Sequence, residues 1–288
     1  MEPEKIKLYG SRDFGANFDL SIKFIKRHLV PVSKGLAYLI PSLLIVAFFM
    51  PNSFKMYYDI GFRASSSVTF MDDMFGPGLF IAYMLLILVM LAMALYTICY
   101  MALYAKQENG EATSSSAVWK KVSKAALPVL GASILFGIMV AVGSLLCLVP
   151  GVLAAVYFGF YMYVYVNEDL GVIGSFRRSY ALVRRNFWVT LGYSLVFSLL
   201  ISMAGCVFVV PYYAGLIASM LQVEFFSNGI VFFILIFISF VGYNFLYPAF
   251  YMAMGVMYYS HRNKLDGLDM ETEIDNIGKY DNNRNAPY

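Results

Sequence analysis

The chain has few charged residues and few of the residue types that bind metals or form disulfides. Only 14% of its 288 residues are Asp, Glu, Lys or Arg, and it has two histidines and three cysteines. A soluble domain typically carries about 25% charged residues. Hydrophobic residues make up 60% of the chain, and the mean hydropathy is +0.67. These figures exclude a soluble globular fold, a disordered chain and a disulfide scaffold, and they indicate an integral membrane protein.

Five runs without a charged residue are long enough to hold helices that cross a bilayer. They cover residues 35–54, 74–105, 125–167, 186–223 and 225–260. A helix needs about 20 residues to cross about 30 Å of hydrocarbon, so the longest run must fold back on itself. We predict its corner at Pro150 and Gly151, because proline interrupts helical hydrogen bonding and glycine tolerates turns. This corner separates spans at about 126–147 and 152–167, which gives six spans in total.

Pro211 is predicted to end the fifth span, which would then cover about 189–210. The remaining residues, 212–223, are too few to cross again and would form a re-entrant or interfacial segment. Pro248 is expected to kink the sixth span. A transmembrane β-barrel is disfavoured, because its strands alternate apolar with polar residues and both faces of these runs are apolar. The sequence therefore predicts an all-α fold, a polytopic membrane helical bundle with about six transmembrane helices.

Lys and Arg are concentrated in alternate loops. If the N-terminus is cytoplasmic, the inner segments are 1–34, 106–124, 168–185 and 261–288, and they hold 19 of the 21 Lys and Arg. Cytoplasmic loops are expected to carry this excess. We therefore predict an inner-membrane protein with both termini in the cytoplasm and no cleavable signal. Its membrane domain, 35–260, would lie between an N-terminal segment and a polar tail.

Two basic amphipathic helices are predicted at the membrane surface. In 173–188, apolar residues recur at spacings of three and four, with arginines beside the stripe. The apolar residues are Ile173, Phe176, Tyr180, Val183 and Phe187, and the arginines are Arg177, Arg178, Arg184 and Arg185. The N-terminal segment repeats this pattern with Phe18, Ile22, Ile25 and Leu29 beside Lys23, Lys26 and Arg27. Because such helices lie in the membrane interface, we expect these seven cations to contact lipid headgroups.

A third basic cluster, at Lys120, Lys121 and Lys124, precedes the third span. The chain could therefore consist of three units, each a basic element followed by a helical hairpin. A simpler alternative is that every inner loop attracts basic residues.

Motifs for catalysis or for metal binding are absent from the sequence. No ionisable residue lies inside the predicted spans, which argues against ion-coupled transport. His28 and His261 have no Cys or His partner at metal-binding spacing, and there is no phosphate-binding glycine loop or hydrolase motif. Glu168 and Asp169 precede an amphipathic helix, where they could stabilise its N-terminus or pair with its arginines. We expect no catalytic residue, no metal site and no cofactor.

The stretch from Pro150 to Trp188 carries a distinctive pattern. A Pro-Gly pair and an aromatic span are followed by Asn-Glu-Asp-x-Gly and then by Ser-Phe-Arg-Arg-Ser-Tyr-x-Leu-Val-Arg-Arg-Asn-Phe-Trp. This pattern resembles the membrane domain that precedes the catalytic barrel in some glycerophosphodiester phosphodiesterases, and related stand-alone bacterial membrane proteins of unknown function. The resemblance implies about six helices with interfacial segments, and a structural role for the matching residues. These are Pro150, Gly151, Glu168, Gly171, Arg178, Ser179, Leu182, Asn186 and Trp188.

Phosphodiesterase activity is not implied, because a chain of this length has no room for the soluble barrel. We expect instead a non-enzymatic protein that organises lipid, or a partner membrane protein, in the cell envelope. Its partners would be membrane lipids and, as a further candidate, another membrane protein, with no nucleic acid. The alternative is a carrier or channel for a neutral or lipid-like substrate.

Overall fold

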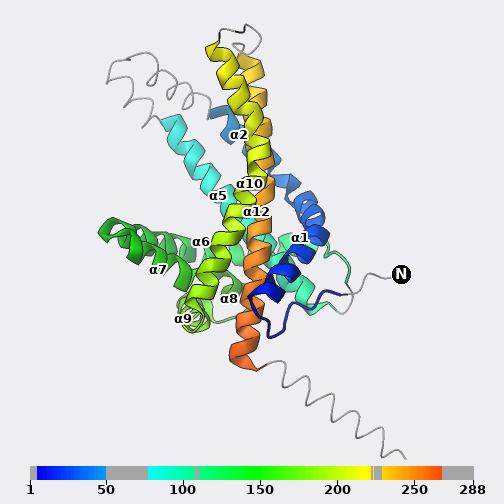
Figure 1. Cartoon of the computed structure of the whole chain (residues 1–288), viewed down its shortest axis with the longest axis vertical. Helices are drawn as coiled ribbons and strands as arrows, with labels where there is room; N and C mark the ends of the chain where they lie inside the picture. Colours follow the sequence, from blue (N-terminus) through cyan, green and yellow to red (C-terminus); the bar gives the residue numbers. More distant parts are fainter. Residues whose placement is uncertain (1–4, 50–76, 108–109, 222, 224–228, 268–288) are drawn as a thin grey trace, which may run out of the picture. The chain divides into compact units, whose positions relative to one another are not determined.

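A computed structural model describes residues 5–49, 77–107, 110–221, 223 and 229–267 (Figure 1). Within these residues the regular structure is entirely helical. The helices are α1 (Phe14–Leu36), η1 (Ala37–Leu39), α2 (Ile40–Phe49), α5 (Pro77–Lys106), α6 (Ser115–Leu146), α7 (Leu148–Phe158), α8 (Tyr161–Glu168), α9 (Gly171–Val183), α10 (Phe187–Met220) and α12 (Gly229–Asp266). The predicted all-α fold is confirmed.

In the part of the chain that the structure describes, six helical stretches are long and apolar enough to cross a membrane. They are Phe14–Val46, Phe80–Lys106, Ser115–Leu146, Leu148–Glu168, Phe187–Gly215 and Ile234–Asp266. Their number agrees with the prediction, and by length and composition the chain is a multi-pass membrane protein. Many large apolar side chains on these helices are exposed, among them Leu145 at 87% and Val207 at 70%, as expected of a surface that faces lipid.

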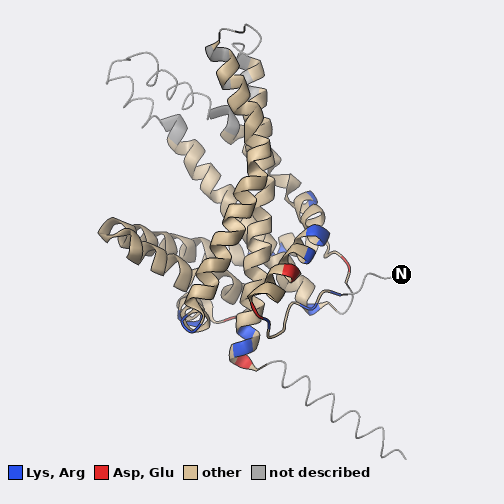
Figure 2. Cartoon of the chain, in the orientation of Figure 1, with Lys and Arg blue, Asp and Glu red and all other residues tan. Residues whose placement is uncertain are grey.

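The chain packs into two compact units. Unit 1 comprises Met1–Val30, Leu95–Phe197 and Phe250–Tyr288, and unit 2 comprises Pro31–Ala94 and Ser198–Ala249. The described part of unit 1 has sixteen Lys and Arg against six Asp and Glu, whereas Lys34 is the one charged residue in the described part of unit 2. Figure 2 shows these cations on α9, along α1 and near the end of α12. Among the described residues, positive charge is therefore concentrated in unit 1.

The N-terminal helix differs from the prediction of an interfacial helix followed by a separate span. Phe14–Val46 is one apolar stretch, built from α1, η1 and α2. The predicted stripe of Phe18, Ile22, Ile25 and Leu29 is only half-buried. The buried face of α1 lies beside it and is formed by Asn17, Ser21, Phe24, His28 and Val32. The last residues of the predicted first span, 50–54, lie outside the described residues.

The corner between α6 and α7 lies three residues before its predicted position. α6 ends at Leu146 and α7 begins at Leu148. Cys147, the one residue between them, has an extended backbone with φ −171° and ψ 151°. Pro150 therefore lies in the first turn of α7, where its missing N–H would have no helical acceptor. At Gly151 α7 lies close to α6, because a Cβ there would meet the backbone and side chain of Ser144. The Pro-Gly pair thus starts the second helix instead of forming the turn.

The predicted span at 152–167 is divided into α7 and α8 by a turn at Gly159 and Phe160. α9 covers this junction and packs against α6, α7 and α8. Phe176 of α9 stacks on Tyr161 at 5.0 Å between ring centroids, and Ala132 of α6 completes the cluster. These contacts form the apolar core of this part of unit 1.

The second predicted amphipathic helix, 173–188, is shorter than expected and is partly buried. α9 ends at Val183, a turn covers residues 184–186, and α10 begins at Phe187. The predicted apolar stripe is divided, because Phe176 and Val183 are buried while Ile173 is 75% and Tyr180 is 44% exposed. The stripe is divided because α9 packs against α6, α7 and α8, and only the side of α9 that contacts these helices is buried.

Pro211 does not end the fifth span. α10 continues through it to Met220, so the prediction of a re-entrant or interfacial segment at 212–223 is wrong. In hydrocarbon an unpaired backbone group costs several kcal/mol, which favours continuing a helix past a proline. Likewise α12 runs through Pro248 and extends to Asp266, six residues beyond the predicted membrane domain. Residues 268–288 of the predicted tail lie outside the described residues.

Candidate functional site

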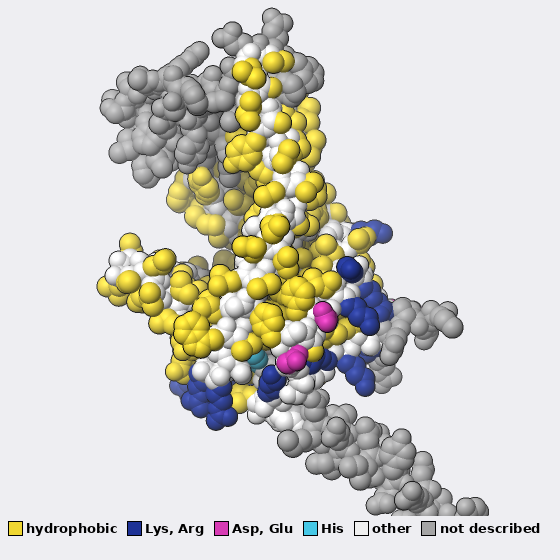
Figure 3. Space-filling model, viewed as in Figure 1, with side chains coloured by type: hydrophobic (Ala, Val, Ile, Leu, Met, Phe, Trp, Pro, Cys, Tyr) yellow, Lys and Arg dark blue, Asp and Glu magenta, His cyan; other side chains and the backbone are white. Residues whose placement is uncertain are grey.

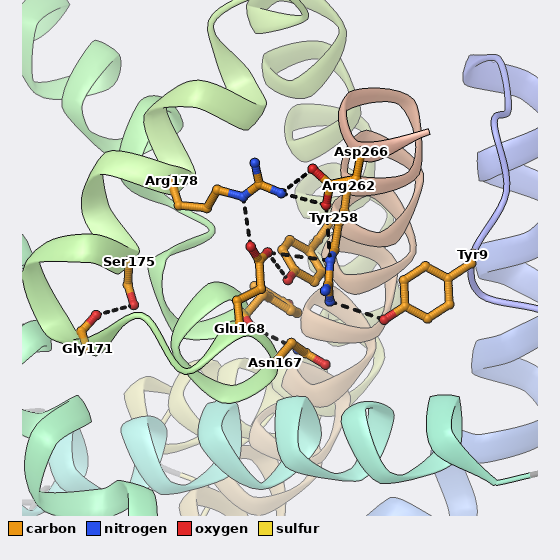
Figure 4. A network of polar contacts seen from close by, with 10 residues as sticks. Tyr9, Asn167, Glu168, Gly171, Ser175, Arg178, Tyr258, Arg262 and Asp266 are labelled. Carbon is orange, nitrogen blue, oxygen red and sulfur yellow. Dashed lines mark hydrogen bonds and ion pairs between the residues drawn. The ribbon is translucent and has the colours of Figure 1, made fainter. Parts of the chain in front are cut away.

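A network of polar contacts in unit 1 lies where α8 ends and α9 begins (Figure 4). Glu168 is the last residue of α8, and the next residue, Asp169, has a left-handed backbone with φ 48°. Gly171 begins α9 with φ +66°, a conformation that glycine adopts without steric penalty. This sharp reversal directs the Glu168 carboxylate toward Arg178 of α9 and toward α12.

Six side chains form this site, which we name the Glu168 network: Tyr9, Glu168, Arg178, Tyr258, Arg262 and Asp266. Arg178 Nε donates to Glu168 Oε2 at 2.7 Å, and the Tyr258 hydroxyl donates to Glu168 Oε1 at 2.7 Å. Arg178 Nη2 donates to both carboxylate oxygens of Asp266, at 2.5 and 2.6 Å.

Arg262 completes the network from the last turn of α12. Its Nε lies 3.7 Å from Glu168 Oε1 and 3.5 Å from Asp266 Oδ2. Its Nη1 donates to the Tyr9 hydroxyl at 3.2 Å, and its guanidinium carbon lies 5.8 Å from the centre of the Tyr9 ring. Residues 5–13, which precede α1 and are called the N-terminal segment from here on, are thereby joined to α12 through Tyr9.

The Glu168 network balances two positive charges with two negative ones. The Glu168 side chain is 8% exposed, while both arginine side chains are 21% and Asp266 is 26% exposed. Burial lowers the pKa of Arg178, but Asp266 and Glu168 raise it more, so its pKa lies above the ordinary value. Burial also raises the pKa of the Tyr9 phenol, and Arg262 opposes that rise. The carboxylates of Asp266 and Glu168 therefore favour the charged form of Arg178.

A second layer of hydrogen bonds lies beneath the Glu168 network. The Tyr259 hydroxyl donates to Asn167 Oδ1 at 3.0 Å, and Asn167 Nδ2 donates to the carbonyl of Tyr163 at 2.8 Å. The Tyr163 hydroxyl donates to the carbonyl of Tyr251 at 2.6 Å. These bonds connect one turn of α8 to about two turns of α12. The two layers together connect α8, α9, α12 and the N-terminal segment.

The contacts of this site connect helices to one another. No group of three or more His, Cys, Asp or Glu side chains within the described residues could hold a metal ion. The Glu168 carboxylate already accepts from Arg178 and Tyr258 and lies near Arg262. Its role is therefore to hold helices together.

Ser179 fixes the junction of α7 and α8 from α9. Its buried hydroxyl donates to the carbonyl of Tyr157 at 2.9 Å and accepts from the N–H of Phe160 at 3.1 Å. Both backbone groups lie at the interruption between two helices, where they would otherwise lack a partner. Asn186 precedes α10, and its backbone carbonyl accepts from the N–H and the hydroxyl of Thr190, both at 2.9 Å. Trp188 is 79% exposed.

The seven cations expected to contact lipid headgroups fall into two groups. Five of them are exposed, namely Lys23, Lys26, Arg177, Arg184 and Arg185. The other two bind within the protein. Arg178 belongs to the Glu168 network, and Arg27 Nη2 donates to the carbonyl of Gly110 at 2.9 Å. The pairing of Glu168 with the following arginines, one of two predicted roles, is thus made with Arg178.

Sequence reasoning missed a buried polar face on α1. Asn17 Nδ2 donates to Ser260 Oγ at 3.1 Å, and the hydroxyls of Ser21 and Tyr193 lie 2.5 Å apart. His28 Nδ1 lies 2.8 Å from the Tyr100 hydroxyl. The signal was present, because Asn17, Ser21 and His28 share one helical face at spacings of four and seven.

The fold and the site together define a multi-pass, all-α membrane protein with a balanced ion-pair network in its cationic unit. The chain belongs to the family described as "Domain of unknown function (DUF7847)", which it matches over residues 79–259. The matched region includes Glu168, Arg178 and Tyr258 but not Tyr9, Arg262 or Asp266. Neither a curated protein nor a solved structure matches the chain. The resemblance to the phosphodiesterase membrane domain stays a prediction.

Proposed function

We propose that this is a non-enzymatic protein of the bacterial inner membrane that binds anionic lipid headgroups on its cytoplasmic side. Through that binding it organises lipid, or a partner membrane protein, in the cell envelope. The charge distribution supports this orientation, because the described part of unit 1 holds sixteen of the Lys and Arg and cytoplasmic segments carry the excess of these residues. Both termini would then be cytoplasmic.

The observation that carries the proposal is the composition of the exposed face of α9. Ile173, Arg177, Tyr180 and Arg184 follow one another at helical spacings of four, three and four, and all four are exposed. Arg185 and Trp188 are exposed just beyond them. We name these six residues the α9 surface.

Large apolar and aromatic side chains alternate with arginines on the α9 surface. Aromatic rings favour the level of the headgroups, and guanidinium groups bind phosphate with two parallel hydrogen bonds. A helix face with both kinds of side chain fits the boundary between hydrocarbon and water. Figure 3 shows the Lys and Arg side chains beside apolar ones at this end of the molecule.

The test replaces the exposed arginines and leaves Arg178 in place. The variant R177Q/R184Q/R185Q, purified in a non-ionic detergent, is titrated with phosphatidylglycerol and with phosphatidylcholine, and lipid binding is followed by native mass spectrometry. A cation near an anionic surface contributes about 1 kcal/mol, so we expect phosphatidylglycerol binding to weaken roughly 10- to 100-fold. Binding of phosphatidylcholine should change little.

The matched control is K106Q/K120Q/K124Q, which removes three exposed cations of unit 1 from α5 and α6. It should weaken phosphatidylglycerol binding much less than the α9 variant. Equal losses in both variants would mean that total charge, and not the α9 surface, sets the affinity. No loss in the α9 variant would contradict the proposed function.

A cavity in unit 2 favours a second candidate, a carrier or channel for a neutral or lipid-like substrate. The cavity measures about 380 Å³, and its lining includes Leu86, Met90, Tyr212, Ser239 and Asn244, with no charged side chain. Ser239 is 7% exposed, and its hydroxyl has no hydrogen-bond partner in the described chain. If this candidate holds, proteoliposomes should translocate a fluorescent phospholipid, and S239L, which fills the cavity, should slow that translocation.

A further inference from the structure

The N-terminal segment and α1 enclose a second concave site, in unit 1. Its volume is about 380 Å³. Five cations line it: Lys5, Lys7, Arg12, Lys23 and Arg27. Ile6 and Leu20 supply the apolar part of the lining, and no carboxylate is among the described residues that line it. We name this site the basic pocket.

Apolar residues of the N-terminal segment pack it against the rest of unit 1. Ile6 is 5% and Leu8 is 2% exposed, and the N–H of Ile6 donates to the Tyr104 hydroxyl at 2.9 Å. The Tyr9 ring packs edge-on against Tyr259 at 4.9 Å between centroids. One wall of the basic pocket is therefore held in place before any ligand binds.

Arg12 shapes this wall by folding the segment into a tight loop. Its guanidinium donates to the carbonyls of Lys7, Leu8 and Tyr9 at 2.7 to 3.0 Å. Gly10, with φ +156°, sits inside the loop, where a Cβ would collide with that guanidinium. The loop thus depends on a glycine at this position.

The opposite wall is a single face of α1. Leu20, Lys23 and Arg27 are spaced by three and four residues and so lie on one side of the helix. Arg27 is positioned by its bond to the carbonyl of Gly110. Lys23 is exposed and so can turn toward a ligand in the pocket.

We propose that the basic pocket binds a phosphate group, carried by the headgroup of an anionic lipid or free in solution. Five like charges around one concavity repel one another, and a bound dianion removes much of that repulsion. Arginine binds phosphate through two parallel hydrogen bonds, and lysine binds it as a point charge. Ile6 and Leu20 would contact the apolar part of a lipid ligand.

This inference rests on the proposed function in one respect, namely that unit 1 faces anionic lipid. It deepens that function by naming a site for one headgroup, in addition to the open α9 surface. The two sites share no residue, so each can be removed without the other. The N-terminal segment would be tied to α1 through the ligand.

The test uses K7Q/K23Q, because both lysines line the basic pocket, are exposed and can be replaced without loss of packing. The full chain in a non-ionic detergent is titrated with short-chain phosphatidic acid, with inorganic phosphate and with short-chain diacylglycerol, which lacks phosphate. Binding is measured by calorimetry. The matched control is K26Q/K34Q, which removes two exposed cations from the same helix outside the pocket.

Affinity for phosphatidic acid should fall about tenfold or more in K7Q/K23Q and less than about threefold in the control. Diacylglycerol should not bind. Competition by inorganic phosphate at similar affinity would identify free phosphate as the ligand, and binding of phosphatidic acid alone would identify the headgroup. Equal affinity in wild type and K7Q/K23Q, or no binding of either phosphate probe, would overturn the proposal.

The two sets of variants test the basic pocket and the proposed function independently. If R177Q/R184Q/R185Q loses phosphatidylglycerol binding while K7Q/K23Q keeps its affinity for phosphatidic acid, the pocket is refuted and the α9 surface stands. The reverse pattern would refute the α9 surface and support the pocket.

Discussion

Replacing Glu168 with glutamine removes one of the two negative charges of the Glu168 network and keeps the size of the side chain. The network then has two arginines and only Asp266 to balance them. The amide presents one acceptor oxygen, whereas the carboxylate accepts from both Arg178 and Tyr258. One donor therefore loses its partner at a position where the side chain is only 8% exposed.

The loss of stability expected for Glu168→Gln depends on how deeply its partners Arg178 and Arg262 are buried. Removing one member of a fully buried ion pair costs about 3–5 kcal/mol. Both arginine side chains are 21% exposed, so water screens part of the lost interaction. We expect Glu168→Gln to lower the free energy of unfolding by about 2 kcal/mol, which corresponds to a decrease in Tm of about 4–8 °C.

Cys99 provides the assay. It is fully buried in α5, whereas Cys147 and Cys206 are exposed. In a C147S/C206S background, a thiol-reactive dye reports unfolding through Cys99 alone as the temperature is raised. The fluorescence midpoint gives Tm for each variant in the same detergent.

Asp169→Asn is the matched control, because it removes the same charge from the adjacent, exposed residue. Asparagine tolerates the left-handed backbone at this position, so we expect a change within about 0.5 kcal/mol. Equal Tm values for E168Q and D169N would refute the claim that the Glu168 network stabilises unit 1. The double variant E168Q/R178Q should be less destabilised than the sum of its single variants, since the two residues share one interaction.

Two further substitutions test the packing around this site. Ser179→Ala leaves a buried carbonyl and a buried N–H without partners and should cost about 1–3 kcal/mol, measured as a decrease in Tm, while Ser123→Ala on the exposed side of α6 should change little. Gly151→Ala places a Cβ against Ser144 and should cost about 1–3 kcal/mol, whereas Gly137→Ala, with nothing within 4 Å, should be neutral or stabilising. A Gly137→Ala variant that is as unstable as Gly151→Ala would contradict this account of the α6–α7 contact.

The number of spans could be predicted because it depends on run length and charge alone. Hydrocarbon excludes charged side chains and unpaired backbone groups, so long apolar runs must form helices. The ends of helices were harder to predict, as Pro150 and Pro211 show. Proline is tolerated in the first turn of a helix, so Pro150 lies just after the corner and not in it, and inside a membrane a helix continues past proline, as α10 does at Pro211.

The Glu168 network could be predicted only in part. Glu168 and Arg178 are ten residues apart, and their pairing was one of two expected roles. Arg262 and Asp266 show a local signal, since residues four apart on a helix are neighbours. Nothing in the sequence places that pair beside Glu168, because the contact depends on how α8 and α12 pack.

The apolar stripes of the two basic helices do not coincide with the faces that pack inside the protein. A stripe of apolar residues predicts the buried side when one side faces water. Next to a membrane, apolar side chains such as Ile173 can face lipid, and polar ones such as Asn17 can be buried with partners. Hydrophobicity alone therefore does not identify the packed face in this setting.

The buried polar face of α1 has a consequence for biogenesis. Asn17 bonds to Ser260, which lies 243 residues later in the chain. At a synthesis rate of about 5–20 residues per second, a ribosome needs roughly 10–50 s to reach that partner. During this interval the start of α1 lacks its final partner for Asn17, so α1 completes its packing late, and a translocon or chaperone has a defined period in which to shelter it.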